Sequence, residues 1–214
     1  MNIYSDKCNV KKAFLIKLFF IFLVITIPVS QVNSYAVKYK EDWYKLYHIH
    51  YAQTQDDCIE NIYWLEKAAR ADFCNPQFVD FKIETEEEWE KYRYLFQMHI
   101  NLKLIEQHLR LGRIYDKKNI YFYDAAFRDE YLRNLEKCLS CYEAGLYYWK
   151  EAKVWCEKAN ESKFNFLYIQ PKQNWEDERE RIVTGELNYE RILNREINRV
   201  KDNMNKLQAM DNSY

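Results

Sequence analysis

The sequence predicts an all-α protein, a bundle of antiparallel helical hairpins with one long central helix. Its 214 residues include only three Gly and three Pro, fewer than the turns of a sandwich or barrel require. Hydrophobic residues make up 48% of the chain, which supplies a sizeable core. Apolar residues also recur at every third or fourth position through most of the chain, and this spacing places side chains on one face of a helix.

The first 36 residues have the order of a secretory signal peptide. Four lysines, at 7, 11, 12 and 17, precede the apolar run 18–27, and small residues follow at 34–36. The run is only about half of the ~20 residues that a spanning helix needs. We therefore expect an exported protein, periplasmic or otherwise extracytoplasmic, with an uncleaved membrane anchor as the alternative.

The charge of the exported chain argues against nucleic-acid binding. Removal of residues 1–36 takes away four Lys and one Asp, so that the formal charge changes from −1 to about −4. An acidic chain without basic clusters is a poor candidate for binding nucleic acid. The expected partners are other proteins of the cell envelope, and membrane contact is expected only through the N-terminal segment.

A helical hairpin is predicted at the start of the exported chain. Its first helix covers residues 40–52, and its second begins at Cys58, after the capping residues 54–57, and ends before Asn75 and Pro76. Residues 77–83 are predicted to form a connection with some extended character.

A third helix of about 26 residues is predicted between a capping box and a terminating glycine. Thr85 and Glu88 form the box, and Gly112 ends the helix. Apolar side chains on two sides predict that this helix is sandwiched between layers. The two rows are Tyr92, Leu95, Leu102 and Leu109 on one side and Tyr94, Met98 and Ile105 on the other. Residues 114–123 follow as a short strand or as a loop packed over the helix ends.

The central helix is predicted over residues 129–160. Eight side chains at steps of three and four share one face and are predicted to form its buried seam: Leu135, Cys138, Tyr142, Gly145, Trp149, Ala152, Cys156 and Ala159. Small residues recur every seven positions from Cys138, which lets a second helix approach closely. A second row of Leu132, Leu139 and Leu146 widens the buried face.

Residues 163–173 are predicted to be an irregular link. Asn174 is expected to cap a short helix that carries Trp175 and Ile182 and that Gly185 ends. Trp175 is the tryptophan with the best chance of exposure, although a packed hinge is the expectation.

The last helix is predicted over residues 188–210 and has a narrow apolar stripe of the kind found in two-helix seams. The stripe, which is the candidate interface, consists of Leu193, Ile197, Val200, Met204 and Leu207. The domain organisation expected is a signal peptide at 1–36, a helical domain at 37–185 and a C-terminal amphipathic helix at 186–214. That helix either packs on the bundle or receives a partner.

Five cysteines remain after the signal is removed: Cys58, Cys74, Cys138, Cys141 and Cys156. Because the number is odd, at least one thiol stays unpaired in an oxidising compartment. Cys138 and Cys156 fall on the apolar seam, where a free cysteine behaves as a small hydrophobe. Buried thiols are expected, and one disulfide or a metal site are the alternatives. A zinc site lacks two further ligands at matched spacing.

No catalytic, metal-binding or cofactor-binding motif is evident. Three glycines cannot build a phosphate loop, and His99 and His108 lie out of phase on their helix. The acids of 84–90 could hold the paired carboxylates of an envelope glycan hydrolase. They also suit the first turn of a helix, whose dipole favours acids. We expect no enzymatic activity and no cofactor, with the hydrolase or a secreted ligand-binding module with exposed Trp and Tyr as alternatives.

Parts of the sequence resemble helical repeats. Residues 43–50 and 58–65 match the two helices of the tetratricopeptide repeat loosely, and Gly145, Trp149 and Ala152 fit the spacing of its second helix. Residues 58–69 and 88–96, with the block 175–189, also resemble a group of small exported spirochaete proteins. Members of that group are similar to periplasmic collar components of the flagellar motor. The resemblance implies a non-enzymatic scaffold that binds other proteins, and it assigns no binding residue.

Overall fold

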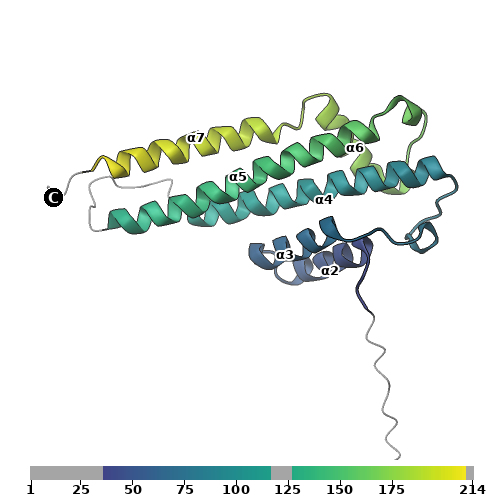
Figure 1. Cartoon of the computed structure of the whole chain (residues 1–214), viewed down its shortest axis with the longest axis horizontal. Helices are drawn as coiled ribbons and strands as arrows, with labels where there is room; N and C mark the ends of the chain where they lie inside the picture. Colours follow the sequence, from purple (N-terminus) through teal and green to yellow (C-terminus); the bar gives the residue numbers. More distant parts are fainter. Residues whose placement is uncertain (1–35, 117–126, 211–214) are drawn as a thin grey trace, which may run out of the picture. The chain divides into compact units, whose positions relative to one another are not determined.

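The described part of the chain, residues 36–116 and 127–210, is helical and contains no strand, which confirms the predicted all-α class (Figure 1). In this computed structural model the chain divides into two units, 1–36 and 37–214, and the following account concerns the second. The predicted signal peptide lies outside the described residues. No helix in the described ranges is both long and apolar enough to cross a membrane.

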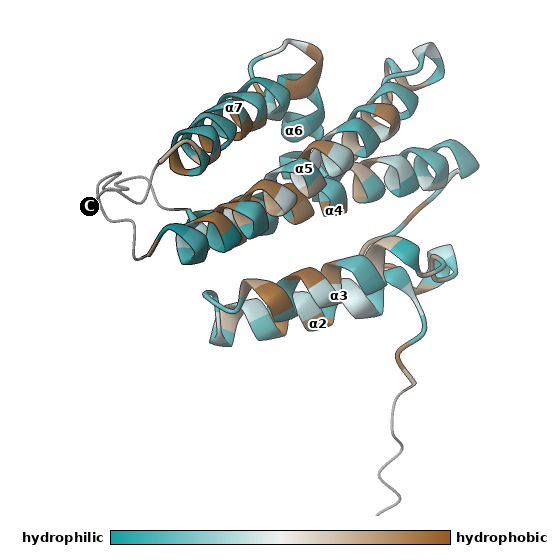
Figure 2. Ribbon diagram, turned by 60° about the vertical axis from the view of Figure 1, so that its left-hand side comes forward, coloured by the Kyte–Doolittle hydropathy of each residue, from teal (hydrophilic) through white to brown (hydrophobic). Residues whose placement is uncertain are grey.

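Six α-helices and three short 3₁₀ turns make up the described residues. In order they are α2 (Lys40–Gln53), α3 (Cys58–Arg70), η1 (Pro76–Phe78), α4 (Glu86–Tyr115), α5 (Arg128–Ala159), η3 (Ser162–Phe164), η4 (Gln170–Lys172), α6 (Gln173–Val183) and α7 (Tyr189–Gln208). Helix α4 packs against α3 on one side and α5 on the other, and α7 packs on α5. Hydrophobic residues form bands along these helices between hydrophilic ones (Figure 2).

Helices α2 and α3 form the predicted hairpin. Asp57 caps α3, because its carboxylate accepts a hydrogen bond of 3.0 Å from the amide of Glu60. The buried ammonium of Lys40 donates to the carbonyls of Ala68 at 2.7 Å and Ala69 at 2.8 Å. A cation at the C-terminus of α3 complements the helix dipole. These bonds tie the first residue of α2 to the last turn of α3.

Helix α4 starts as predicted and ends later than predicted. The capping box is present: the amide of Glu88 donates to Thr85 Oγ1 at 3.1 Å, and the amide of Thr85 donates to Glu88 Oε2 at 3.3 Å. The helix continues to Tyr115, so the prediction that Gly112 ends it is wrong. A Cβ at Gly112 would lie 2.8 Å from Cδ1 of Tyr142 and closer still to Cε1. This glycine therefore provides a close approach between α4 and α5.

Both predicted faces of α4 are covered. The structure buries Tyr92, Leu95, Leu102 and Leu109 of one row and Met98 and Ile105 of the other, while Tyr94 is half-buried. A helix that is covered on two sides is the middle layer of the bundle.

The buried residues of α5 are the eight of its predicted seam, from Leu135 to Ala159. Leu132, Leu139 and Leu146 are half-buried beside them. The face that the 3.6-residue period defines is therefore the face that meets α4 and α7.

Helix α6 begins one residue before the predicted cap. The turn η4 runs directly into the helix at Gln173, so Asn174 lies inside the first turn and makes no cap; that prediction is wrong. Trp175 is buried, and its ring stacks on Phe96 at 4.9 Å between centroids. Gly185 follows the helix with a φ of 77°, a backbone conformation that glycine adopts readily.

Helix α7 places its apolar stripe against α5. Leu193, Ile197, Val200 and Leu207 are buried and Met204 is half-buried. Of the two predicted alternatives, the structure has the stripe packed inside the bundle. Beside the middle of this stripe, Arg199 Nη1 donates to Asp116 at 3.1 Å, which ties α7 to the C-terminal end of α4.

The structure describes the two predicted connections, 77–83 and 114–123, only in part or in a different form. Residues 77–83 start within the turn η1 and contain no strand. Most of 114–123 lies outside the described residues, and residues 114 and 115 belong to the last turn of α4.

Candidate functional site

The sequence-predicted interface and seam residues lie in the interior of the bundle. The stripe of α7, from Leu193 to Leu207, faces α5, and the seam of α5 faces α4 and α7. These side chains hold the helices together, so a partner cannot reach them in this arrangement.

The acidic cluster at 84–90 does not form a paired site. Glu84, Glu86 and Glu87 are exposed, and Glu88 serves as the capping acid. Glu90 accepts hydrogen bonds from Tyr94 at 2.7 Å and from Lys163 at 2.8 Å. The start of α4 thus accounts for these acids, which suit the positive end of its dipole.

The two histidines of α4 serve different packing roles. His99 lies where α2, α4 and α6 meet; its Nδ1 is 2.5 Å from a carboxylate oxygen of Glu178, and its Nε2 is 2.5 Å from the hydroxyl of Tyr44. His108 stacks on Tyr148 at 5.4 Å, and burial lowers its pKa. The two rings have separate partners, as the spacing predicts.

The five cysteines in the part of the chain that the structure describes are free thiols. Cys58, Cys74, Cys138 and Cys156 are buried, and Cys141 is half-buried. Burial raises the pKa of Cys74 and Cys138 to about 12 and that of Cys156 to about 11, so these thiols are poor nucleophiles. Among the described residues, no group of three or more His, Cys, Asp and Glu is placed to hold a metal ion.

A buried ion cluster joins α4 to α6. Lys91 Nζ lies 2.7 Å from Glu176 Oε1, and Arg179 Nε donates to Glu176 Oε2 at 3.1 Å. The side chains of Lys91 and Glu176 are only 3% and 1% exposed. We call Lys91, Glu176 and Arg179 the ion cluster. Buried charges are stable only when they are paired and hydrogen-bonded, and each member of this cluster has such partners.

The ion cluster also fixes the backbone of residues 160–173, the segment that joins α5 to α6 and that we call the 160–173 connection. Lys91 Nζ donates to the carbonyl of Leu167, and the amide of Ile169 donates to Glu176 Oε1 at 3.2 Å. Phe164 and Ile169 are buried on either side of these bonds. The connection is therefore held by charge-assisted bonds and by two apolar anchors.

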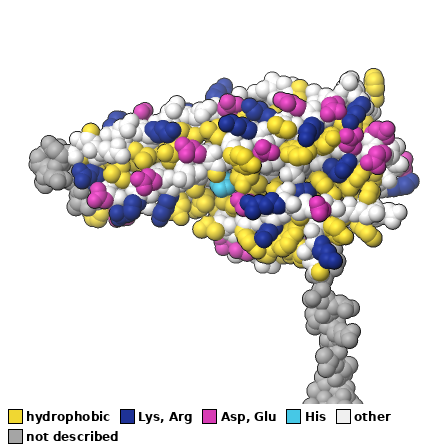
Figure 3. Space-filling model, viewed as in Figure 1, with side chains coloured by type: hydrophobic (Ala, Val, Ile, Leu, Met, Phe, Trp, Pro, Cys, Tyr) yellow, Lys and Arg dark blue, Asp and Glu magenta, His cyan; other side chains and the backbone are white. Residues whose placement is uncertain are grey.

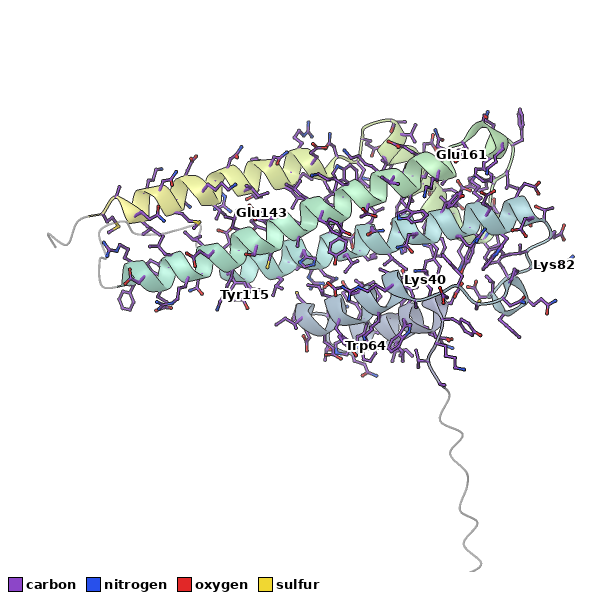
Figure 4. All side chains as sticks on the ribbon, in the orientation of Figure 1. Lys40, Trp64, Lys82, Tyr115, Glu143 and Glu161 are labelled. Atoms are coloured by element: carbon purple, nitrogen blue, oxygen red, sulfur yellow. The ribbon has the colours of Figure 1, made fainter. Side chains whose placement is uncertain are left out.

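An aromatic side chain projects from the middle of this connection. Phe166 is fully exposed, more than any other large hydrophobic residue that the structure describes, and Tyr168 is also exposed. The anchored backbone directs the Phe164 side chain into the bundle and the Phe166 side chain into solvent. Figure 4 shows the connection at one end of the bundle, where the label of Glu161 marks its beginning.

A small cavity of about 130 Å³ lies beneath the connection. It is lined by Lys91, Ala159, Asn160, Glu161, Phe164, Asn165, Leu167, Tyr168 and Arg179. Its wall is mainly polar and includes two members of the ion cluster. On the face of the molecule in Figure 3, basic side chains are interspersed with acidic and hydrophobic ones and do not gather into one patch.

Of the residues that line this cavity, the periodicity of the sequence predicts only Ala159, and it does so as a member of the α5 seam. One signal was available: Lys91, Met98 and Ile105 are spaced by seven residues, so Lys91 lies in register with a buried row. A lysine in such a row needs a buried partner. The identity of that partner, 85 residues later in the chain, depends on the tertiary fold and has no local signal.

The comparisons with known proteins place the site inside a family region. A family model described as a domain of unknown function (DUF8513) matches residues 87–210. These residues extend from the first turn of α4 through α7 and include the 160–173 connection, whereas α2 and α3 precede them. No curated protein and no solved structure matches the chain.

Proposed function

The chain belongs to the family described as a domain of unknown function (DUF8513), and since this description names no activity, we propose a function from the geometry of the 160–173 connection. We propose that the protein is a non-enzymatic scaffold that binds another protein through this connection, with Phe166 as the anchor. The observation that carries the proposal is a fully exposed Phe on a backbone that buried charges hold in place.

The arrangement has the physical properties of a binding surface. Interfaces are enriched in aromatic residues, and a few such residues contribute most of the binding energy. A loop that is already ordered before binding loses little conformational entropy when the partner arrives. Because the flanks of Phe166 are anchored to α4 and α6, the partner would meet a preformed contact.

The proposed setting is the cell envelope. The signal-like order of residues 1–36 supports export, and the resemblance to periplasmic collar components of the flagellar motor supports a structural role among envelope proteins. Membrane contact, in this proposal, is limited to the N-terminal segment, and the partner is an envelope protein.

Crosslinking from single positions tests the proposal. A photoreactive phenylalanine analogue replaces Phe166 in one version of the protein and Ile59 in another, in cells that produce the protein naturally. Ile59 is the matched control, because it is 64% exposed on α3, away from the connection in the sequence. We expect a discrete crosslinked protein from position 166 that position 59 does not give. An identical pattern from both positions, or none from position 166, would contradict the proposal.

The variant F166A adds a functional arm. Because Phe166 is fully exposed, its removal should leave the melting temperature within about 1 °C of the wild type. Recovery of the crosslink target by the tagged protein should fall, whereas I59A should recover it normally.

A further inference from the structure

The ion cluster contains one more positive charge than negative charge. Lys91 and Arg179 are the cations, and among the described residues Glu176 is the one carboxylate bonded to both. The Lys91 side chain is almost inaccessible and Arg179 is 20% exposed. Burial, together with the neighbouring Arg179, lowers the pKa of Lys91, although Glu176 opposes this change. A buried excess of charge favours an additional anion nearby.

Hydrogen-bond donors of this cluster face the cavity. Arg179 uses Nε for Glu176 and Nη1 for Asn160 Oδ1, at 2.6 Å, and its Nη2 has no hydrogen-bond partner among the residues that the structure describes. Since the oxygen of Asn160 accepts from Arg179, the side-chain NH₂ of Asn160 is left as a donor. Lys91, Asn160 and Arg179 all line the cavity.

The acidic side chains around the cavity are bonded to a lysine or are in contact with water. Glu161 lines the cavity and shares Lys163 with Glu90, at 3.2 Å and 2.8 Å, so these three side chains carry one net negative charge, and both carboxylates are bonded to Lys163. Asp177 and Glu180 are exposed on α6 and act on Tyr168, whose pKa is raised mainly by desolvation and then by these acids. Their charges are in contact with water and are screened by it.

We propose that this cavity binds the C-terminal carboxylate of the partner protein, with Arg179 and Asn160 as donors. Phe166 then packs against an apolar side chain next to that carboxylate. The inference rests on the proposed scaffold function and specifies the chemistry of its partner. A guanidinium with free N–H groups is well suited to a carboxylate, since it donates two parallel bonds.

A small aromatic acid serves as the probe. N-acetylphenylalanine has one carboxylate beside one aromatic ring, and its amide is the neutral match. The acid and the amide are each titrated into the protein. The shift of the NMR signal of the Arg179 Nε–H group during each titration gives the affinity of that ligand. We expect the acid to bind about ten-fold tighter than the amide or more, because a hydrogen bond to a charged group is worth that much when it is desolvated.

Two variants on α6 separate the pocket from general charge effects. R179Q removes the guanidinium group and its positive charge and leaves Lys91 paired with Glu176. The fold is therefore retained, and calorimetry should detect no binding of the acid. R181Q is the matched control, because Arg181 is exposed on the same helix and pairs with Glu186 at 3.2 Å. It should bind the acid like the wild type.

N160D provides a second arm that does not remove a cation. It places a carboxylate beside Arg179 within the chain itself, and we expect it to abolish binding of the acid. Equal binding of acid and amide by the wild type, or undiminished binding by R179Q, overturns the inference. If the crosslink from position 166 nevertheless forms, the scaffold proposal stands without the pocket; if the acid binds but the crosslink is missing, only the scaffold proposal fails.

Discussion

Glu176 is the residue on which the 160–173 connection depends most. Its carboxylate contacts Lys91, Arg179 and the amide of Ile169, and its side chain is only 1% exposed. A buried carboxylate of this kind must be matched by cations and donors, and the two cations share it.

Substitutions within the ion cluster should have unequal effects. E176Q leaves two cations without a carboxylate and should lower the free energy of unfolding by about 3–5 kcal/mol, the usual effect of breaking a buried pair. K91M should cost less, because Arg179 still pairs with Glu176. Urea unfolding of both variants measures the difference. K82A is the control, since Lys82 pairs with Glu84 on the surface. A smaller loss for E176Q than for K91M would contradict this account of the cluster.

At the scale of residues, the buried apolar positions could be predicted from the sequence, whereas the roles of single Gly and Asn residues could not. The seam of α5 and the stripe of α7 follow from periodicity, since hydrophobic burial depends mainly on side-chain type and spacing. The prediction that Gly112 ends a helix and the prediction that Asn174 caps one were both wrong. These are the common local roles of Gly and Asn, but here the tertiary structure gives each residue a different position. Gly112 faces the ring of Tyr142, and Asn174 follows the turn η4 into a helix that has already begun.

At the scale of elements, the approach of α4 to α5 depends on Gly112. Alanine usually stabilises a helix relative to glycine by about 1 kcal/mol. Here the added Cβ would collide with ring atoms of Tyr142, which is itself buried.

G112A should therefore destabilise the protein, by about 1–3 kcal/mol, as is typical of an overpacked core. G145A is the comparison, because a Cβ at Gly145 meets only the methyl end of Leu193, at 3.1 Å, and should cost less. Thermal unfolding of the two variants gives the order. A G112A variant that is more stable than the wild type would show that the ring has room to move.

The α7 seam allows a similar test. Val200 and Leu207 are fully buried against the bundle. V200E and L207E should each reduce the free energy of unfolding by about 3 kcal/mol or more, because each buries a carboxylate without a partner. K201E, at an exposed neighbouring position, should have little effect. Unchanged melting of V200E and L207E would mean that α7 does not pack on α5 in solution.

Element boundaries were predictable where capping residues are present. Thr85 with Glu88, Asp57 and Asn188 all begin helices at or within one residue of the predicted start. The 160–173 connection could not be predicted in the same way. Its turns are held by bonds to Lys91 and Glu176 on other elements, and local sequence carries no information about those bonds.

At the scale of the whole second unit, α4 packs against α3, α5 and α6, so it joins the α2–α3 hairpin to the rest of the bundle. The α2–α3 hairpin lies outside the family match and contacts α4 and α5 partly through polar bonds. Arg110 donates to Tyr51 at 3.0 Å and to Asp56 at 3.2 Å, and Tyr148 donates to Glu66 at 2.9 Å. The family region, α4 to α7, contains the seam, the ion cluster and the proposed binding surface.

The buried thiols and phenols predict how stability depends on pH. Burial raises the pKa of Cys74 and Cys138 from 9.0 to about 12 and that of Tyr189 from 10.0 to about 12. Above about pH 9 these groups ionise in the unfolded chain and keep their protons in the folded one. The folded state then binds more protons, so its stability falls as pH rises.

We therefore expect the urea midpoint to decrease steadily between about pH 9 and pH 12. Lys40 acts in the opposite direction, because burial lowers its pKa from 10.5 to about 8. Buried cysteines and tyrosines with raised pKa values outnumber the two lysines with lowered ones among the described residues. Circular dichroism at constant ionic strength follows the transition, and C138A should show a shallower decline. A midpoint that is flat or rises over this range would contradict the prediction.

Hydrogen exchange at the backbone amide of Ile169 tests most directly whether the 160–173 connection is held rigid. This amide donates to the buried carboxylate of Glu176. If the connection is ordered before any partner binds, the amide should exchange as slowly as those of α6 and about 100-fold more slowly than the amide of Phe166. E176Q should remove this protection. Exchange of Ile169 as fast as that of Phe166 in the wild-type protein would show that the aromatic anchor is not preformed.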